Sequence, residues 1–304
     1  MQSLWMLLAA FLLAVTGVAI KYAAAAGLST GETVFYRTFI GVVVVSVMMA
    51  GLRVSPRSVH TRALLYRGLA GTFAMWLFMY SVVHLPLSTA ITLNFTAPLW
   101  IALILALVFG ERLSKTMTAA LVLGFIGIVM LLKPIFVPEM RFDITIGLLS
   151  GVAGATALLN VRRLGALGEP DMRIFLWSSS VIALGAALWL TATGGWHMHG
   201  FDAVKWVVAM GALATAAQLC QTRAYSRGGT ILTANLSYAT VLFSALADLL
   251  LWGVRIPASG WLAIALIIAS GIMATLRSRK GARREARAET AAPSIQPEPP
   301  LPES

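Results

Sequence analysis

Residues 110–133, GERLSKTMTAALVLGFIGIVMLLK, align without a gap with residues 253–276, GVRIPASGWLAIALIIASGIMATL, when the chain is shifted by 143 positions. The same shift places further identical residues on one another: Gly68, Thr72, Leu93, Leu103, Gly110, Arg112 and Met130 fall on Gly211, Thr215, Leu236, Leu246, Gly253, Arg255 and Met273. Each match between apolar segments is weak alone, but the constant register indicates an internal repeat.

The composition is that of a membrane protein. Hydrophobic residues make up 59% of the 304 positions and charged residues only 12%, whereas a water-soluble domain carries about 25% charged residues. Apolar runs between charged or Gly/Pro breaks give ten candidate spans, which are residues 4–24, 32–52, 64–83, 87–109, 116–132, 146–161, 174–193, 206–225, 230–252 and 259–276. The predicted fold class is therefore an all-α integral membrane protein with ten transmembrane helices.

The repeat and the number of spans predict two inverted halves. Residues 1–133 form the first five-helix repeat, residues 134–144 a periplasmic linker, residues 145–276 the second repeat, and residues 277–304 a cytoplasmic tail. The tail is basic at first and then rich in Pro and Glu, and we expect this last part to be disordered. Because each half has an odd number of spans, the second half enters the membrane in the opposite direction. This arrangement is typical of alternating-access transporters, which bind their substrate near the midplane.

The basic residues predict the orientation. With the N-terminus in the cytoplasm, 17 Lys and Arg residues fall inside and five outside, while Arg37 lies within a span. We therefore expect both termini in the cytoplasm and the protein in the cell (inner) membrane. This asymmetry accounts for the net charge of +11, so no nucleic-acid partner is expected. No Lys or Arg precedes Lys21, so the first segment lacks the basic region of a signal peptide and is predicted to be a retained span.

Several motifs carry a family resemblance. They are NFTAPLWIALILALVFGERLS at residues 94–114, Arg37 within VFYRTFIG, Pro98, and the Gly110-Glu111 pair. Together with the five-plus-five organisation, they make residues 4–276 resemble the EamA-type members of the drug/metabolite transporter superfamily. The resemblance implies a ten-helix transporter of small organic metabolites. The second half departs from the pattern, because Val241 and Val254 stand where the first half has Pro98 and Glu111.

Polar residues inside the fourth span indicate a cavity. Pro98 has no N–H group, so the carbonyl of Asn94 loses its helical hydrogen bond, and a membrane tolerates such a group only where protein or a water-lined cavity receives it. Thr89, Thr92 and Thr96 form a second stripe on nearly the opposite face of the helix. We expect the Asn94 face to line a cavity and the threonine stripe to pack against a helix. The alternative is that Pro98 only kinks the span.

Neighbouring spans supply compatible polar and aromatic faces, so spans three, four, eight and nine are predicted to line the cavity. The predicted substrate-binding residues are Trp76, Tyr80, Asn94, Pro98, Asn160, Trp177, Gln218, Gln221, Asn235 and Tyr238. Aromatic rings beside uncharged amides suit a flat or apolar solute with a polar edge, such as an amino acid or a nucleobase. The alternative is that the aromatic residues only pack or form interfacial belts. In span six, Gly147-x-x-x-Gly151 predicts close helix packing.

Four ionisable residues are candidates for gating, coupling or structural roles: Arg37, Glu111, Arg112 and Asp248. Arg37 can extend outward, pair with Glu32 or Asp248, or bind a substrate carboxylate. Asp248 is either a proton-coupling acid or an exposed residue at the membrane interface. Glu111 and Arg112 predict a gate or a loop salt bridge at the inner mouth of span four.

The sequence predicts neither a metal nor a cofactor, and no catalytic residue. Cys220 is the only cysteine, which excludes an intrachain disulfide and a multi-cysteine metal site, and the pair of His197 and His199 has no further ligand nearby. An intramembrane enzyme would need clustered acids, histidines or a metal. The predicted function is alternating-access transport of small organic metabolites, as an exporter of amino acids or similar flat or apolar solutes; the alternative is a lipid or amphiphile flippase or a membrane scaffold. The expected partners are a small-molecule substrate and the lipid bilayer, and a homodimer is left open.

Overall fold

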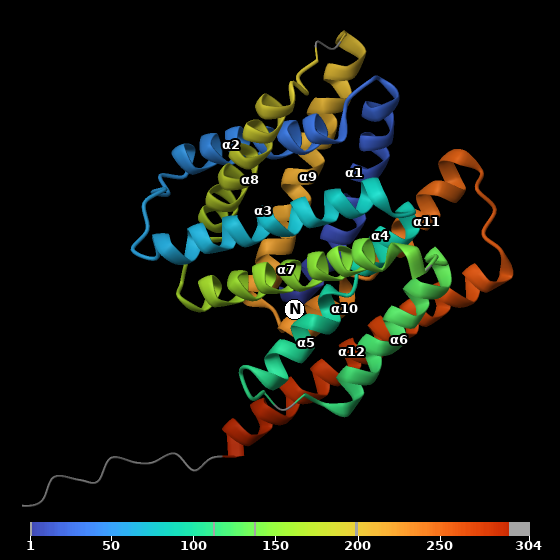
Figure 1. Cartoon of the computed structure of the whole chain (residues 1–304). Coiled ribbons are helices and arrows are strands. Elements are labelled where there is room, and N and C mark those ends of the chain that lie inside the picture. Colours follow the sequence, from blue (N-terminus) through green and yellow to red (C-terminus); the bar gives the residue numbers. More distant parts are fainter. Residues whose placement is uncertain (1, 112, 137, 198–199, 292–304) are drawn as a thin grey trace, which may run out of the picture.

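The computed structural model describes residues 2–111, 113–136, 138–197 and 200–291, and every regular element in these ranges is a helix (Figure 1). The first half contains α1 (Trp5–Ala25), α2 (Thr30–Gly51), α3 (Thr61–His84), α4 (Leu87–Asn94), α5 (Ala97–Leu107) and α6 (Lys115–Leu132). The second half contains α7 (Arg141–Ala166), α8 (Asp171–Thr193), α9 (Phe201–Arg227), α10 (Thr230–Leu236), α11 (Ala239–Trp252) and α12 (Ala258–Ala291). Short 3₁₀ turns, η1 (Gln2–Leu4) and η2 (Pro138–Met140), precede α1 and α7. The predicted all-α membrane fold is confirmed.

Nine helical segments in the described part of the chain are long and apolar enough to cross a bilayer. Two of these segments, residues 87–107 and 230–252, each combine two helices. The one predicted span outside these nine is the third, which is α3. It has 24 residues but carries Arg62 and Arg67 in its first two turns. α12 continues to Ala291, so helix also covers the basic part of the predicted tail. The Pro/Glu-rich part lies mostly outside the described residues, and the inversion of the second half stays a prediction.

The fourth and ninth spans are both broken. Residues 95–96 separate α4 from α5, and residues 237–238 separate α10 from α11. Under the shift of 143 positions the two breaks coincide to within one residue. Pro98 lies at the second position of α5, where a missing N–H costs little, and Val241 holds the corresponding place after the second break. The proline is therefore not required to break the helix.

The two breaks meet inside the bundle, where α5 contacts α10 (Figure 1). The rings of Phe95 and Tyr238, which correspond under the shift, have their centroids 6.4 Å apart. Gly151 of α7 lies against the first break, and a Cβ atom there would come within 2.9 Å of the Leu93 carbonyl oxygen. Gly124 of α6 lies against the second break, and a Cβ atom there would come within 2.6 Å of the Tyr238 ring. The close packing predicted for the glycine pair of span six is confirmed.

Hydrogen bonds show which loops and helix ends lie together at one end of the bundle. One end, called the basic end below, carries the N-terminal turn and the loops at residues 52–60, 108–114, 167–170 and 228–229. Three hydrogen bonds connect these parts: Arg223 to Gln2 at 3.2 Å, Arg173 to the Ser55 carbonyl at 2.9 Å, and Arg277 to Ser114 at 2.9 Å. Gln2 and Arg277 thus lie at the same end of the bundle, as the predicted topology requires for the first and last spans.

Candidate functional site

A buried polar cluster lies at the second break, formed by Tyr225 of α9, Asn235 of α10 and Tyr238 just before α11; it is called the central polar cluster below. Tyr225 and Asn235 are each 1% exposed, and Tyr238 is fully buried. Thr233 donates to the Ala224 carbonyl at 3.2 Å, which holds α10 beside the end of α9. Both amide atoms of Asn235 and the Tyr238 hydroxyl have no hydrogen-bond partner among the described residues, whereas the Tyr225 hydroxyl lies within reach of the Ser237 hydroxyl.

These unpaired groups are costly for the folded state. A buried polar group without a partner costs about 1–3 kcal/mol, and the central polar cluster contains the two amide atoms of Asn235 and the Tyr238 hydroxyl as such groups among the described residues. Native proteins leave few groups of this kind, and each one calls for an explanation such as a bound solute or water. The cluster therefore contains one donor-and-acceptor amide and one phenolic hydroxyl that lack partners among the described residues of this membrane-embedded region.

A groove of about 360 Å³ connects Asn235 with the outer surface of the bundle. Its walls come from α1, α10, α11 and α12, and its lining is apolar except for Asn235 and Thr275. Ile268 and Ile272 of α12 are 45% and 55% exposed beside it, so this side of the groove would face lipid. An apolar molecule with a polar end could enter along this groove and meet the Asn235 amide.

The first break approaches the same region from the other half. Asn94 donates to the Ser150 hydroxyl of α7 at 3.4 Å, and Pro98 is buried. The threonine stripe is also buried, and its residues bond as follows: Thr89 with both the carbonyl and the amide of Ile135, Thr92 with the Ser88 carbonyl, and Thr96 with the Leu93 carbonyl. The prediction that this stripe packs against neighbouring protein is therefore confirmed.

Comparisons with known proteins agree with this architecture. Residues 1–133 match the model of the EamA-like transporter family. The pseudopaline exporter CntI of Pseudomonas aeruginosa is 28% identical over 280 residues, which cover 90% of this chain and 95% of the exporter. The resemblance to the EamA-type transporters is confirmed.

Two further comparisons extend over most of the chain. The riboflavin transporter of Vibrio cholerae is 25% identical over 290 residues, which cover 93% of this chain and 95% of that transporter. A crystal structure with a TM-score of 0.80 and 22% sequence identity covers 91% of this chain and 98% of its own. This structural likeness shows the shared fold alone.

The remaining predicted binding residues lie in several places. Trp76 is 41% exposed and packs edge-on against Trp189 of α8, with ring centroids 5.1 Å apart. Tyr80 donates to Asp143 at 3.0 Å, and Trp177 donates to the Pro56 carbonyl at 3.0 Å in the loop before α3. Trp76 and Trp177 therefore lie apart from the central polar cluster, one on an outer face and the other at the basic end.

The predicted amides of α9 and α7 also differ in position. Gln218 and Gln221 are half-buried on α9, and neither makes a hydrogen bond to the described residues. Asn160 of α7 is 6% exposed, and its Oδ1 atom has no partner among them. Asn160 lines a separate pocket at the basic end. The binding roles of all three amides stay predictions.

Glu32 and Asp248, the two carboxylates considered as partners of Arg37, make other contacts in the structure. Glu32 accepts from the Ser29 amide at 2.9 Å, which completes a capping box at the start of α2, and from the His197 amide at 2.8 Å. Asp248 pairs with Lys21 at 2.5 Å. Both carboxylates considered for Arg37 are therefore engaged elsewhere.

At the end of the fourth span, Glu111 pairs with Arg162 of α7 at 2.6 Å, which is a salt bridge between the halves. Arg112 lies outside the described residues. Arg37 is half-buried within α2 and has no carboxylate partner in the described part of the chain. The ligand role of Arg37 and a gating role of Glu111 stay predictions.

Sequence reasoning missed Arg67 of α3 and did not include Tyr225 among the predicted binding residues. Arg67 is 7% exposed, and its Nε atom has no partner among the described residues. Its guanidinium lies along the helix over Gly71, near Ile182 of α8, and so close to the middle of the 24-residue α3. A charge at such depth is costly and commonly functional. The spacing Arg67-x-x-x-Gly71 is the signal that could have found it, because the glycine leaves room for the side chain.

Proposed function

We propose that this chain carries small organic metabolites across the membrane by alternating access of its two five-helix halves, without a catalytic step. The observation that carries the proposal is the central polar cluster, where the Asn235 amide and the Tyr238 hydroxyl are buried without a partner among the described residues and Tyr238 lies against Phe95 of the first break. Transporters with inverted repeats bind substrate at the repeat interface near the midplane, on discontinuous helices. The breaks at residues 95–96 and 237–238 have the position that this mechanism needs.

The substrate class follows from the chemistry of these groups. The rings of Tyr225 and Tyr238 and the amide of Asn235 suit a flat or apolar body with a polar edge. The unpaired guanidinium of Arg67, near mid-membrane, suits a carboxylate. The cluster alone favours aromatic or branched amino acids, and we propose them, with nucleobases next, as exported solutes; Arg67, beside Ile182 of α8, would be a separate contact for their carboxylate. The relatives named for pseudopaline export and riboflavin transport support organic metabolites as a class.

One observation favours a second candidate, a carrier of lipids or other amphiphiles. The groove beside α12 is apolar, opens toward the lipid-facing surface and ends at Asn235. A molecule entering from the bilayer would use this route, whereas a water-soluble amino acid would enter from an end of the bundle.

Counterflow in proteoliposomes tests both candidates. Vesicles loaded with amino acids, nucleobases or nucleosides are given labelled solute outside, and protein-dependent, saturable uptake is followed. We expect exchange of at least one amino acid, strongly reduced in Asn235→Leu and Tyr238→Phe. Thr16→Val is the matched control, because Thr16 is buried but donates to a carbonyl of its own helix.

The outcomes separate the proposals. Exchange that survives both cluster variants would place the site elsewhere in the bundle. Absence of exchange over the whole panel, from protein that unfolds cooperatively, would contradict the metabolite proposal. Movement of a labelled phospholipid between leaflets, lost in Asn235→Leu, would then establish the amphiphile carrier.

We also propose that the basic end faces the cytoplasm of the inner membrane, with both termini there, because most Lys and Arg residues gather at it. A cysteine introduced at Arg57 in a Cys220→Ser background tests this orientation. We expect a membrane-impermeant thiol reagent to label it only after the cells are opened, and labelling in intact cells would reverse the topology.

A further inference from the structure

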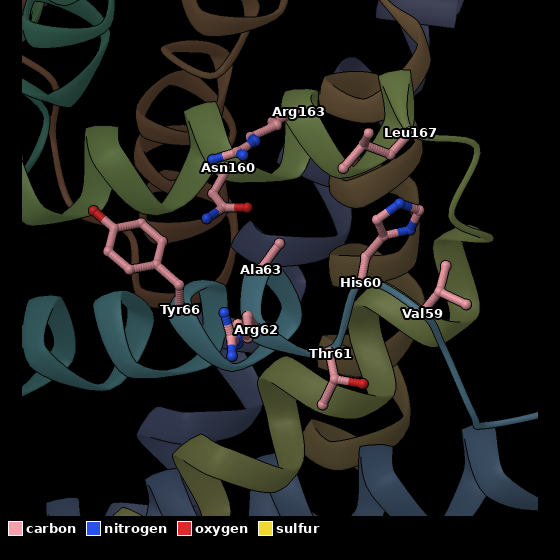
Figure 2. A pocket seen from close by; sticks show the side chains of 9 residues that line it. All are labelled: Val59, His60, Thr61, Arg62, Ala63, Tyr66, Asn160, Arg163 and Leu167. Atoms are coloured by element: carbon pink, nitrogen blue, oxygen red, sulfur yellow. The ribbon is translucent and has the colours of Figure 1, made fainter.

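A polar pocket, separate from the apolar groove beside Asn235, lies at the basic end of the bundle. Its volume is about 640 Å³, and it is formed by the start of α3 and the end of α7. Figure 2 shows Asn160 and Arg163 of α7 on one side, facing His60, Arg62 and Tyr66 on the other. The pocket is thus bounded by two guanidiniums, an imidazole, a phenol and an amide.

In the described part of the chain, the two arginines of this pocket lack the carboxylate partners that three other arginines at the same end have. Arg162, Arg173 and Arg227 each have a carboxylate partner, at 2.6, 2.7 and 3.5 Å. Arg62 and Arg163 have none among the described residues, and both are exposed. Two unpaired guanidiniums at one pocket favour an anionic ligand, and the planar guanidinium matches the geometry of carboxylate and phosphate groups.

Glu169, the carboxylate that contacts His60 of the pocket, is already engaged. Glu169 is 5% exposed; Ser58 donates to it, His60 lies 3.0 Å from it through Nδ1, and Arg173 binds its other oxygen at 2.7 Å. Three partners therefore use this carboxylate, so it leaves the positive charge of Arg62 and Arg163 uncompensated.

Asn160 supplies an independent indication of a ligand. It is 6% exposed, it points into the pocket, and its Oδ1 atom is unpaired among the described residues (Figure 2). An unpaired carbonyl oxygen needs a donor. The ligand should therefore combine a negative group for the arginines with a hydroxyl for Asn160.

The position of the pocket indicates where this ligand comes from. Arg62 is the second residue of α3, and Arg163 lies in the last turn of α7, so both are at the level where spans leave the hydrocarbon. Tyr66 and Leu167 are 53% and 43% exposed beside them. Basic pockets between transmembrane helices at this level bind anionic lipid head groups.

We propose that this pocket binds the head group of an anionic glycerophospholipid that carries a hydroxyl, of the phosphatidylglycerol type. Arg62 and Arg163 bind the phosphodiester, Tyr66 flanks the glycerol backbone, and Asn160 accepts a hydrogen bond from the head-group hydroxyl. The site is independent of the transported solute and gives Asn160 a ligand other than that solute.

Native mass spectrometry of the full chain with added lipids tests the assignment. We expect one phosphatidylglycerol to bind in preference to phosphatidylcholine. The double variant Arg62→Gln/Arg163→Gln should weaken it about thirtyfold, since each basic residue near a lipid surface contributes roughly fivefold. The control is Arg53→Gln/Arg57→Gln, which removes the same charge from exposed, unpaired positions of the adjacent loop. Equal weakening by the two double variants would show only diffuse attraction and overturn the site.

Two further comparisons test the chemistry of the ligand. Asn160→Leu keeps the charge, so it should leave phosphatidylmethanol binding unchanged and weaken phosphatidylglycerol about fivefold, as expected for one hydrogen bond. Equal loss for both lipids, or for neither, would contradict the role of Asn160. Soluble glycerol phosphate should not displace the lipid at equal concentration. If it does, the site takes free phosphate esters and the lipid assignment is wrong. All variants must keep the unfolding midpoint of the parent protein.

Discussion

Replacing Gly151 by Ala should loosen the contact between α7 and the first break. A Cβ atom at this position would press on the Thr96 hydroxyl and lie 2.9 Å from the Leu93 carbonyl oxygen. Neither neighbour can move freely, because Thr96 donates to that carbonyl at 2.6 Å and accepts from Trp100 Nε1 at 3.1 Å. The added methyl group must therefore displace either a hydrogen-bonded turn or α7 itself.

Gly154→Ala supplies a matched control on the same helix. At Gly154 the nearest atom to a new Cβ is 3.9 Å away, which is an ordinary contact. Both variants gain about 1 kcal/mol of helix propensity, so this gain cancels in their comparison. Overpacking costs about 1–3 kcal/mol, and Gly151→Ala should therefore be less stable than Gly154→Ala by that amount.

Reversible denaturation in mixed micelles measures this difference, and counterflow measures its effect on transport. We expect Gly154→Ala to match or exceed the parent protein in stability and Gly151→Ala to unfold at a lower denaturant concentration. Equal denaturation midpoints for the two alanine variants would refute the argument, because they would mean that the first break does not pack tightly against Gly151.

Three other outcomes are expected. Pro98→Ala should keep the break at residues 95–96 and change the free energy of unfolding by less than about 1 kcal/mol, because the second break forms without a proline; a continuous helix in its structure would contradict this. Asp248→Asn should leave the pH profile of counterflow unchanged, since the Lys21–Asp248 pair is exposed, and a shifted profile would make Asp248 the coupling acid. Burial raises the pKa of Glu169, but hydrogen bonds from Ser58, Arg173 and His60 outweigh it and hold the pKa below its usual 4.5. The contribution of Glu169 to stability is thus present above that pH and is lost as the pH falls through the lowered pKa. In Glu169→Gln the free energy of unfolding should therefore fall less steeply at acid pH. An unchanged fall would refute this argument.

The spans were predictable because hydropathy is a local property. The third span was expected at residues 64–83 and lies at Thr61–His84, although Arg62 and Arg67 lower its apolar character. The breaks were not placed by local pattern. The sequence indicated a disturbance at Pro98, whereas α4 ends upstream of it, and the ninth span has no proline at the corresponding position. Tertiary contacts with glycines of other helices accompany both breaks, and such contacts cannot be read from one segment.

The candidate site was predictable only in part, for a similar reason. Periodicity shows which residues share a face of a helix, but it does not show what that face contacts. Asn235 and Tyr238 lie at the crossing of the broken spans, while Trp76 lies against Trp189 on an exposed face. Arg67 was counted as a charge near a loop, because its reach over Gly71 toward the middle of α3 depends on the packing of α8.

The glycines that pack against the two breaks connect the proposed halves. The first break belongs to the first half and rests on Gly151 of α7 in the second, while the second break belongs to the second half and rests on Gly124 of α6 in the first. Movement of one half against the other must therefore change the contacts of both breaks together. Under this argument Gly124→Ala, whose Cβ would lie 2.6 Å from the Tyr238 ring and 2.7 Å from the Ser270 hydroxyl, should slow counterflow as Gly151→Ala does. If only one of the two variants slows exchange while both are equally destabilised, the breaks move independently and the coupling between the halves lies elsewhere.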